Sequence, residues 1–303
     1  MRLSQRIRRT LVYWLASICI RVFNFIPRKL AVFLGGWVGL AAWKIITKDQ
    51  RLIFRHLSIC YNGTLSTVEK VNIGQRFFVN SGRNIADLVR FEKHFERELA
   101  PLTDFEGLEH FDRAYKKGRG VFGITAHLGN YELLAVVLGK LGYRIGVISR
   151  PLADKRLNEL LVGTRQRLGI VNFYASDYPL GVVRWLKSGG AVGVLIDTDS
   201  EKARGNFVPF YQIMAKVPVG QSIIAAKLGV PLVPMACVRV GGSNYKVIIR
   251  PEIPINISSG PEKEVCRITR ACNRELEVLI QQYPDQWIWM HNRWRSSPGI
   301  IRA

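Results

Sequence analysis

The stretch from Val121 to Leu141 limits the possible fold most narrowly, because it changes from strand to helix across a short polar turn. Its first five residues, to Thr125, are apolar and β-prone, which predicts a buried strand. Asn130 is a favourable N-cap residue, and the segment from Tyr131 onward has the composition of a helix. The sequence therefore predicts a strand–turn–helix unit of the kind that builds α/β sheets.

Strand and helix signals alternate along the rest of the chain, and a glycine-rich turn at 241–244 predicts a hairpin. We expect an α/β fold with a largely parallel central sheet flanked by helices. We also expect a linker at 101–106 and a loop at 204–211 that exposes aromatic residues, either over the core or along an acyl-chain groove. In this interpretation, residues 1–48 form a basic hydrophobic membrane anchor and 49–303 form the functional domain.

The N-terminal segment has no acidic residue before Asp49. Its apolar runs, 11–20 and 30–43, are shorter than the roughly 20 residues of a spanning helix, and no A-x-A-like cleavage site follows. A core helix with basic flanks is one interpretation. We favour a helical segment that anchors in the bilayer interface, with its basic flanks on the cytoplasmic side. Those flanks are Arg2, Arg6, Arg8, Arg9, Arg21, Arg28 and Lys29.

The net charge of +21 predicts a polyanionic partner, which could be nucleic acid, an anionic membrane surface or an acidic protein. The five cysteines are scattered and lack metal-ligand spacing, which is typical of a reducing compartment. We find no Walker loop, nucleophile elbow, zinc-protease motif or dinucleotide fingerprint. The sequence therefore predicts neither a metal nor a cofactor.

His127 lies in the turn where the first strand should end, and Glu132 lies in the first turn of the helix that follows. Two helical residues five apart point roughly 140° away from each other, so His127 must precede the helix if the two act together. A carboxylate that holds one imidazole nitrogen stabilises the imidazolium formed at the other. We therefore expect His127 and Glu132 to form a general-base pair. The alternative is that the helix dipole alone favours Glu132 and that His127 is a surface or capping residue.

Three further groups could carry chemistry. Arg165 and Arg167 fall on the two edges of a predicted helix, where they either cover apolar surface or hold an anionic group. Asp197 ends a predicted strand, either as part of a solvated turn or as a residue that shapes the site. The segment 285–294 combines three tryptophans with basic residues, which suits a membrane interface, and we expect His291 to be structural.

Several stretches together resemble the bacterial lipid A biosynthesis acyltransferases, the lauroyl and myristoyl transferases within the H-x4-D/E glycerolipid acyltransferases. HLGNYE is similar to that signature, with His127 and Glu132 as its two members and Tyr131 where the family's Trp is expected. The other stretches occur in the family's order and extend the resemblance over nearly the whole chain. They are SRPLADKRLNELLVGTRQRLG, GAVGVLIDTDS, GNFVPFYQIMAKVPVGQSIIAAKLGVPLVP and YPDQWIWMHNRW.

The resemblance implies an enzyme on the cytoplasmic face of the bacterial inner membrane. It would move an acyl chain from a thioester, on acyl carrier protein or CoA, to a hydroxyl of a phosphorylated glycolipid. His127 would be the general base and Glu132 its orienting partner, while Arg150, Arg165 and Arg167 would engage phosphate or the oxyanion. Backbone N–H groups near Asn130 could also stabilise the oxyanion. Asn130 and Asp197 complete the expected substrate site.

Three alternatives remain open at this point. A related transferase could use acyl-CoA to acylate another glycolipid, such as a phosphatidylinositol mannoside. A basic nucleic-acid-binding protein would show salt-sensitive affinity for DNA or RNA, but we expect no nucleic-acid partner because no recognition motif is present. A non-catalytic membrane scaffold would tolerate the loss of both His127 and Glu132.

Overall fold

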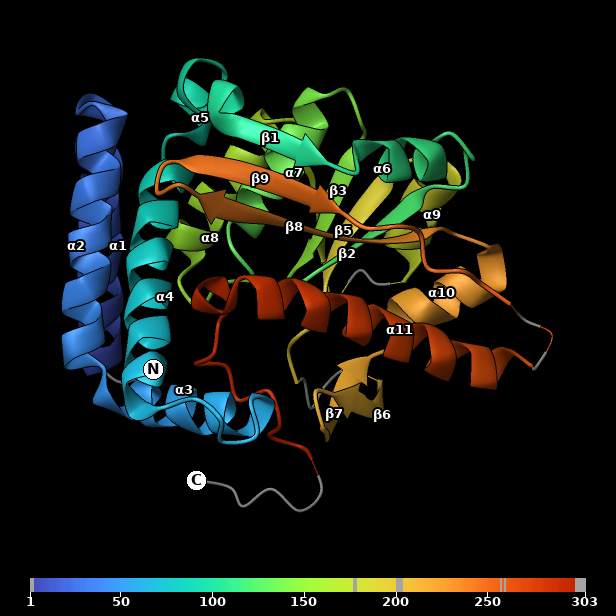
Figure 1. Ribbon diagram of the computed structural model, residues 1–303. Helices are drawn as coiled ribbons and strands as arrows, with labels where there is room; N and C mark the ends of the chain where they lie inside the picture. Colours follow the sequence, from blue (N-terminus) through green and yellow to red (C-terminus); the bar gives the residue numbers. More distant parts are fainter. Residues whose placement is uncertain (1–2, 177–178, 200–203, 257, 259, 298–303) are drawn as a thin grey trace.

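A seven-stranded sheet with helices on both faces forms the centre of the protein (Figure 1). The computed structural model describes residues 3–176, 179–199, 204–256, 258 and 260–297. The sheet order is β1-β9-β8-β2-β5-β3-β4, and its neighbours run parallel except for the antiparallel pair β8–β9. The expected fold class is confirmed. The strands are β1 (Thr103–Glu106), β2 (Val121–Thr125), β3 (Ile145–Ser149), β4 (Val171–Tyr174), β5 (Ala191–Leu195), β8 (Leu232–Val240) and β9 (Asn244–Ile249).

The N-terminal third of the chain is helical, and its helices α1, α2 and α4 pack beside the sheet, with α3 below them (Figure 1). A box of reciprocal hydrogen bonds between Ser66 and Glu69 starts α4. The elements are α1 (Leu3–Phe25), α2 (Arg28–Ile45), α3 (Thr47–Cys60), α4 (Thr67–Leu88), α5 (Phe91–His94), the π-helical turn η1 (Phe95–Leu99) and the 3₁₀ turn η2 (Ala100–Leu102).

The remaining helices cover the two faces of the sheet. One face packs against α6 and α7, and the other against α9, α10 and α11. All five residues of β2 are buried, with Phe122 and Ile124 in the core of one face and Val121 in that of the other. The helices are α6 (Leu108–Tyr115), α7 (Tyr131–Lys140), α8 (Lys155–Arg167), α9 (Leu180–Lys187), α10 (Gly220–Leu228), α11 (Pro261–Gln282) and the 3₁₀ turn η4 (Pro284–Gln286).

Two expected irregular segments are strands, so these expectations were wrong. Part of the 101–106 linker is β1, which pairs with β9 at the edge of the sheet. The 204–211 loop largely forms β6 (Gly205–Phe210), whose antiparallel partner is β7 (Ile213–Pro218). Phe210 is fully buried because this hairpin packs into the core, whereas Phe207 on the same strand stays exposed. The hairpin therefore contributes more to the core than to an open surface.

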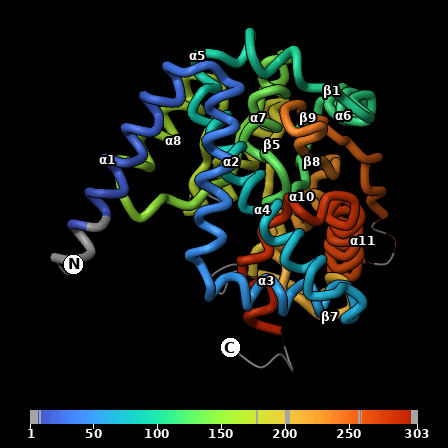
Figure 2. Tube along the Cα trace, turned by 60° about the vertical axis from the view of Figure 1, so that its left-hand side comes forward, coloured from blue at the N-terminus to red at the C-terminus, as the bar shows by residue number. Residues whose placement is uncertain are grey.

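Helix α2 lies directly against α4 because glycines allow their backbones to touch. A Cβ at Gly35 would lie 2.5 Å from the carbonyl oxygen of Gly82, so no larger residue fits there without displacement. The outer sides of α1 and α2 carry exposed apolar residues, among them Leu11, Trp14, Leu15, Phe33, Trp37 and Val38. Figure 2 shows α1 leaning away from the sheet alongside α8, where the guanidinium of Arg156 lies 4.3 Å from the ring centroid of Tyr13.

Among the described residues, no single helix is both long enough and apolar enough to cross a bilayer. The α2–α3 pair meets both criteria together, but it bends by 90°.

Candidate active site

His127 and Asp197 meet at the carboxyl ends of two neighbouring parallel strands. Strands β2 and β5 pair so that Thr125 lies opposite Leu195, which places His127 and Asp197 each two residues beyond a strand. Asp197 Oδ1 lies 2.8 Å from Nδ1 of His127, and its Oδ2 accepts a hydrogen bond from the His127 backbone N–H at 2.9 Å. The pair thus fixes both the imidazole and the loop that carries it.

The hydrogen bonds of Asp197 also determine which nitrogen of His127 can act as a base. Asp197 is 1% exposed, and its Oδ2 accepts a further hydrogen bond from the Trp287 indole at 2.8 Å. An ionised carboxylate only accepts, so Nδ1 of His127 carries the proton and its Nε2 has the free lone pair. The expected site residue Asp197 therefore lies in the site, and Trp287 supports it.

Charge favours the ionised form of both partners. Burial alone would lower the pKa of His127, but the charge of Asp197, its hydrogen bond and the charge of Glu132 outweigh burial and raise that pKa above 6.5. Burial disfavours the Asp197 carboxylate, yet the charge and hydrogen bonds of His127 and the indole of Trp287 lower its pKa to about 2. Asp197 is therefore ionised at neutral pH, and a proton on His127 is stabilised.

Glu132 does not hold the His127 imidazole. Among the residues that the structure describes, no hydrogen bond joins the two, and the expected orienting role belongs to Asp197. Glu132 instead binds Arg165, whose Nε donates to Oε2 at 3.0 Å and whose second terminal nitrogen bonds Oε1. Glu132 lies in the first turn of α7 and Arg165 in the last turn of α8, so this ion pair links the two helices. The charge of Glu132 nevertheless contributes to the raised pKa of His127.

The three candidate arginines have different surroundings. Arg165 is 9% exposed and also donates to the Asn172 side-chain oxygen at 2.6 Å, so it does not simply cover apolar surface. Arg167 is exposed and pairs with Glu92 through two hydrogen bonds of 2.7 and 2.9 Å. Arg150 is exposed directly after β3. The structure therefore brings Arg165 into the His127 region and engages Arg167 elsewhere.

Asn130 caps α7 as predicted, with its side-chain oxygen accepting from Leu133 N at 3.1 Å. In the turn before α7, Gly129 has a φ of +61°, in the left-handed region that favours glycine. The N–H of Gly129 donates to Gln286 O at 3.0 Å and that of Asn130 to Cys237 O at 2.7 Å. The N–H groups of Gly129 and Asn130 are thus engaged within the fold, and neither of these two is available to an oxyanion.

The C-terminal segment is the part of the site that sequence reasoning placed incorrectly. Trp287, Trp289 and Trp294 are at most 1% exposed, so they belong to the core and not to a membrane interface. The segment lies across the loop that carries His127, because Ile288 N donates to His127 O at 3.2 Å. The Trp–basic spacing indicated an unusual segment, but no pattern in it indicated that Trp287 would bond Asp197.

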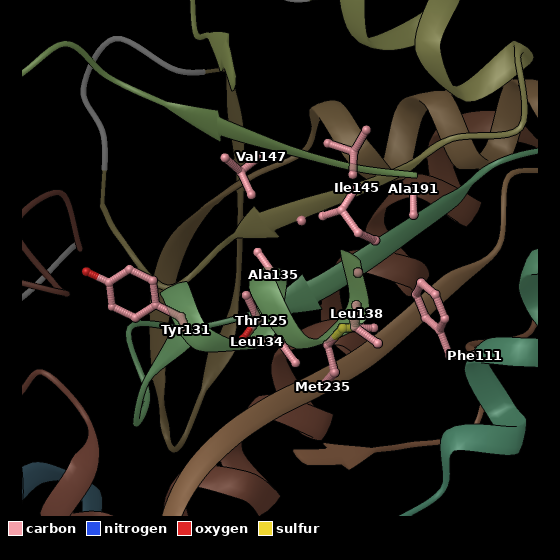
Figure 3. A pocket seen from close by; sticks show the side chains of 13 residues that line it. Phe111, Thr125, Tyr131, Leu134, Ala135, Leu138, Ile145, Val147, Ala191 and Met235 are labelled. Atoms are coloured by element: carbon pink, nitrogen blue, oxygen red, sulfur yellow. The ribbon is translucent and has the colours of Figure 1, made fainter. Parts of the chain in front are cut away.

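A narrow apolar cavity adjoins the site between α7 and the sheet (Figure 3). Tyr131 lies at one end of it and Phe111 at the other, as Figure 3 shows. Gly123 and Gly193, which pair across β2 and β5, line it, so no side chain fills the middle. The Thr125 hydroxyl is buried there without a partner among the described residues. The remaining lining is almost wholly hydrocarbon, which suits an apolar ligand.

Across the described part of the chain, no group of three or more His, Cys, Asp or Glu side chains is arranged to hold a metal ion. The described cysteines are free thiols, and Cys60, Cys237 and Cys272 are buried. Burial raises the pKa of the Cys272 thiol to about 12. Cys272 therefore remains a neutral thiol at neutral pH.

Fold and site together define an α/β protein with a histidine–carboxylate pair at the carboxyl edge of its sheet, beside an apolar cavity. Residues 2–296 match the family model described as bacterial lipid A biosynthesis acyltransferase. The chain belongs to this family and is therefore an acyltransferase of lipid A biosynthesis. This assignment sets aside the nucleic-acid-binding and scaffold alternatives.

Named relatives agree with the family. The lipid A biosynthesis lauroyltransferase of Escherichia coli K12 is 25% identical over 292 residues, covering 94% of this chain and 93% of the relative. The palmitoleoyltransferase of the same organism is 23% identical over 291 residues, covering 94% and 92%. The crystal structure of 1-acyl-sn-glycerophosphate acyltransferase from Thermotoga maritima is 14% identical, covers 83% of this chain and 98% of that one, and gives a TM-score of 0.34.

Proposed function

We propose that this protein transfers a fatty acyl chain from an acyl thioester to a hydroxyl of a lipid A precursor, with His127 as general base. The observation that carries the proposal is the 2.8 Å contact between His127 Nδ1 and the buried Asp197 carboxylate. It leaves Nε2 free to accept a proton and supplies the charge that stabilises the imidazolium.

The reaction needs no covalent enzyme intermediate. The acceptor hydroxyl gives its proton to Nε2 of His127 as its oxygen attacks the thioester carbonyl carbon. The tetrahedral intermediate then collapses, the C–S bond breaks, and the thiolate takes the proton back from His127. The products are an ester and a free thiol, and the enzyme returns to its starting state. General acid–base catalysis of this kind contributes roughly 10²–10⁴-fold.

Glu132 and Arg165 act one step away from the base. Their ion pair places a second negative charge near His127 and fixes Arg165 against Asn172. We assign the first contact with an acceptor phosphate to Arg150, because it follows β3 at the same edge of the parallel sheet as His127 and Asp197. A guanidinium suits phosphate because it can donate two parallel hydrogen bonds.

The apolar cavity is the seat that we propose for the acyl chain. One end of it lies at Tyr131, whose ring centroid is 5.2 Å from that of His127, and its lining is almost wholly apolar as far as Phe111. A chain held there would present its thioester carbonyl beside the base. Burial of each methylene would contribute about 0.8 kcal/mol.

The outer sides of α1 and α2 suit an anionic membrane surface. They combine exposed aromatic and aliphatic side chains with a segment that has no acidic residue before Asp49. Arg28 is an exception among the basic flanks, because it is buried and bonded to Asp87 at 2.7 Å. We place the enzyme on the cytoplasmic face of the inner membrane, where the +21 charge also suits an acidic acyl carrier protein.

The test is an assay of purified enzyme in lipid vesicles, with acyl carrier protein and CoA thioesters offered separately to a lipid A precursor and read by mass spectrometry. His127→Ala should remove transfer, while its folding and vesicle binding persist. His110→Ala, which changes a histidine on α6, is the matched control and should transfer normally. Full transfer by His127→Ala would refute the mechanism.

A further inference from the structure

A second histidine lies against the proposed base. The ring centroids of His291 and His127 are 5.0 Å apart with an interplanar angle of 70°, and Tyr131 packs on His127 in a similar way. His291 belongs to the segment that carries Trp287, and its backbone N–H donates to Ile288 O at 3.2 Å. The position of His291 is therefore set by the same segment whose Trp287 bonds Asp197 and whose Ile288 bonds the backbone of His127.

The two nitrogens of His291 differ in their surroundings. Nδ1 is buried and has no hydrogen-bond partner among the described residues, while the ring as a whole is only partly buried. Burial and the neighbouring charge of His127 lower the pKa of His291, against a smaller opposing effect of Asp197. The imidazole is therefore neutral at neutral pH. A proton on Nδ1 would be a buried donor without an acceptor, so we place the proton on Nε2.

Three groups expected to stabilise the negative charge that develops on the thioester oxygen are already engaged within the described part of the chain. The N–H groups of Gly129 and Asn130 already bond Gln286 and Cys237, and Arg165 is engaged by Glu132 and Asn172. A neutral imidazole can stabilise an oxyanion by donating a hydrogen bond. It also adds no positive charge beside the imidazolium that forms on His127.

We propose that His291 is a second catalytic histidine, which donates a hydrogen bond from Nε2 to the thioester carbonyl oxygen during acyl transfer. This proposal rests on the function proposed above. The bond strengthens as the acceptor oxygen attacks and the carbonyl oxygen gains negative charge. When the C–S bond breaks, the carbonyl re-forms and His291 keeps its proton. The proton that moves is the one that His127 takes from the acceptor and gives to the thiolate.

Three substitutions of His291 separate a donor from a packing residue. Phe keeps an aromatic ring against His127 but cannot donate. The side-chain amide nitrogen of Gln takes the place of Nε2, and that of Asn takes the place of Nδ1. The matched control is His110→Phe on α6. Each variant is compared with wild type for kcat, for KM of the acyl thioester and for thermal unfolding in the same vesicles.

We expect His291→Phe to lower kcat roughly 10²–10³-fold, the loss typical of one oxyanion donor, while KM stays within a few-fold. His291→Gln should recover at least tenfold over Phe, and His291→Asn should not. A wild-type kcat in His291→Phe, or an equal loss in Phe and Gln, would overturn the proposal, as would recovery by Asn alone. If Phe impairs folding, the Gln and Asn pair decides alone.

The outcome is separable from that of the proposed function. Full activity of His127→Ala would refute the base mechanism, whatever His291 does. A dead His127→Ala together with a fully active His291→Phe would leave the base mechanism in place and remove only the oxyanion donor.

Discussion

Asp197 Oδ1 lies 2.8 Å from Nδ1 of His127, although 70 positions separate the two residues in the chain. They meet because β2 and β5 are adjacent in the sheet and end at the same edge. A carboxylate in this position sets the tautomer of the imidazole and stabilises its protonated form. The pairing of β2 with β5 therefore brings the carboxylate to the proposed base. Substitution of Asp197 is the most direct test of whether His127 depends on that carboxylate.

Asp197→Asn should lower kcat by roughly 10²–10⁴-fold, because an amide neither stabilises the imidazolium nor imposes the productive tautomer. The enzyme is active when His127 is neutral, so kcat/KM should rise with pH through the raised pKa of His127. Removing the Asp197 charge while burial remains lowers that pKa, so the rise should move to lower pH. The measurement is a pH profile of the initial rate.

Asp199→Asn is the control for that profile. Asp199 lies two residues away, and its carboxylate bonds the backbone and hydroxyl of Ser296 at 2.6 and 2.9 Å. A normal pH profile is expected. An unchanged profile in Asp197→Asn as well would show that His127 does not depend on this carboxylate.

The Glu132–Arg165 pair should matter to both stability and rate. Glu132→Gln or Arg165→Met leaves one partner partly buried without its counter-charge, at a cost of about 1–3 kcal/mol. The double variant should regain much of that free energy of unfolding, as coupled sites do. Transfer should stay reduced in it, because the charge of Glu132 near His127 is lost. Chemical denaturation and the transfer assay measure the two effects.

The exposed pair of Glu92 and Arg167 provides the comparison. The corresponding single and double substitutions of Glu92 and Arg167 should change the free energy of unfolding by about 0–1 kcal/mol, since solvent screens exposed charges. If the Glu132–Arg165 cycle gave an equally small coupling with normal transfer, this pair would have no part in the site.

The sequence predicts local features of this molecule better than contacts between distant segments. The strand at 121–125 and the Asn130 cap follow from short-range preferences, and the structure confirms them. The choice of Glu132 as partner of His127 followed chain proximity. The partner is Asp197 because β5 enters the sheet beside β2, and no local pattern encodes that adjacency.

Burial was the second limit. Three tryptophans among basic residues at 287–294 suit an interface by composition, but α3, α11 and the β6–β7 hairpin enclose them. The 204–211 segment was expected as a loop, either over the core or along a groove, and it is a strand whose Phe210 is buried in the core. Composition describes what a side chain could contact, whereas the long-range packing decides what it does contact.

If the acyl chain occupies the apolar cavity, adding a single methyl group to the cavity lining should change the preferred length of the acyl chain. A Cβ at Gly193 would lie 3.7 Å from Val147 Cγ1, an ordinary contact, so Gly193→Ala should fold and fill part of the cavity. We expect kcat/KM for the longest accepted chain to fall about fourfold or more relative to shorter chains, as one lost methylene site implies. Competition between thioesters of different length, read by mass spectrometry, measures this ratio.

Gly139→Ala on α7 is the control for the cavity. A Cβ at Gly139 meets no atom within 4 Å, so the cavity should keep its shape and the preference should not change. Equal length profiles for Gly193→Ala and wild type would place the acyl chain somewhere other than this cavity.

Membrane binding should depend on the outer side of α2. Phe33 and Trp37 are each 58% exposed, so replacing both with Glu should leave the fold intact. Each side chain inserted into lipid would contribute about 1.5–3 kcal/mol, so the double variant should bind vesicles of anionic phospholipid at least about 10²-fold more weakly.

Leu180→Glu, which changes a 77% exposed position on α9, is the control and should bind normally. Co-sedimentation with vesicles at increasing salt separates apolar insertion from the attraction of basic residues to anionic lipid, because salt screening weakens only the attraction. If the double variant bound as wild type does, the apolar faces of α1 and α2 would need a different partner, and the cytoplasmic-membrane placement would lose its physical basis.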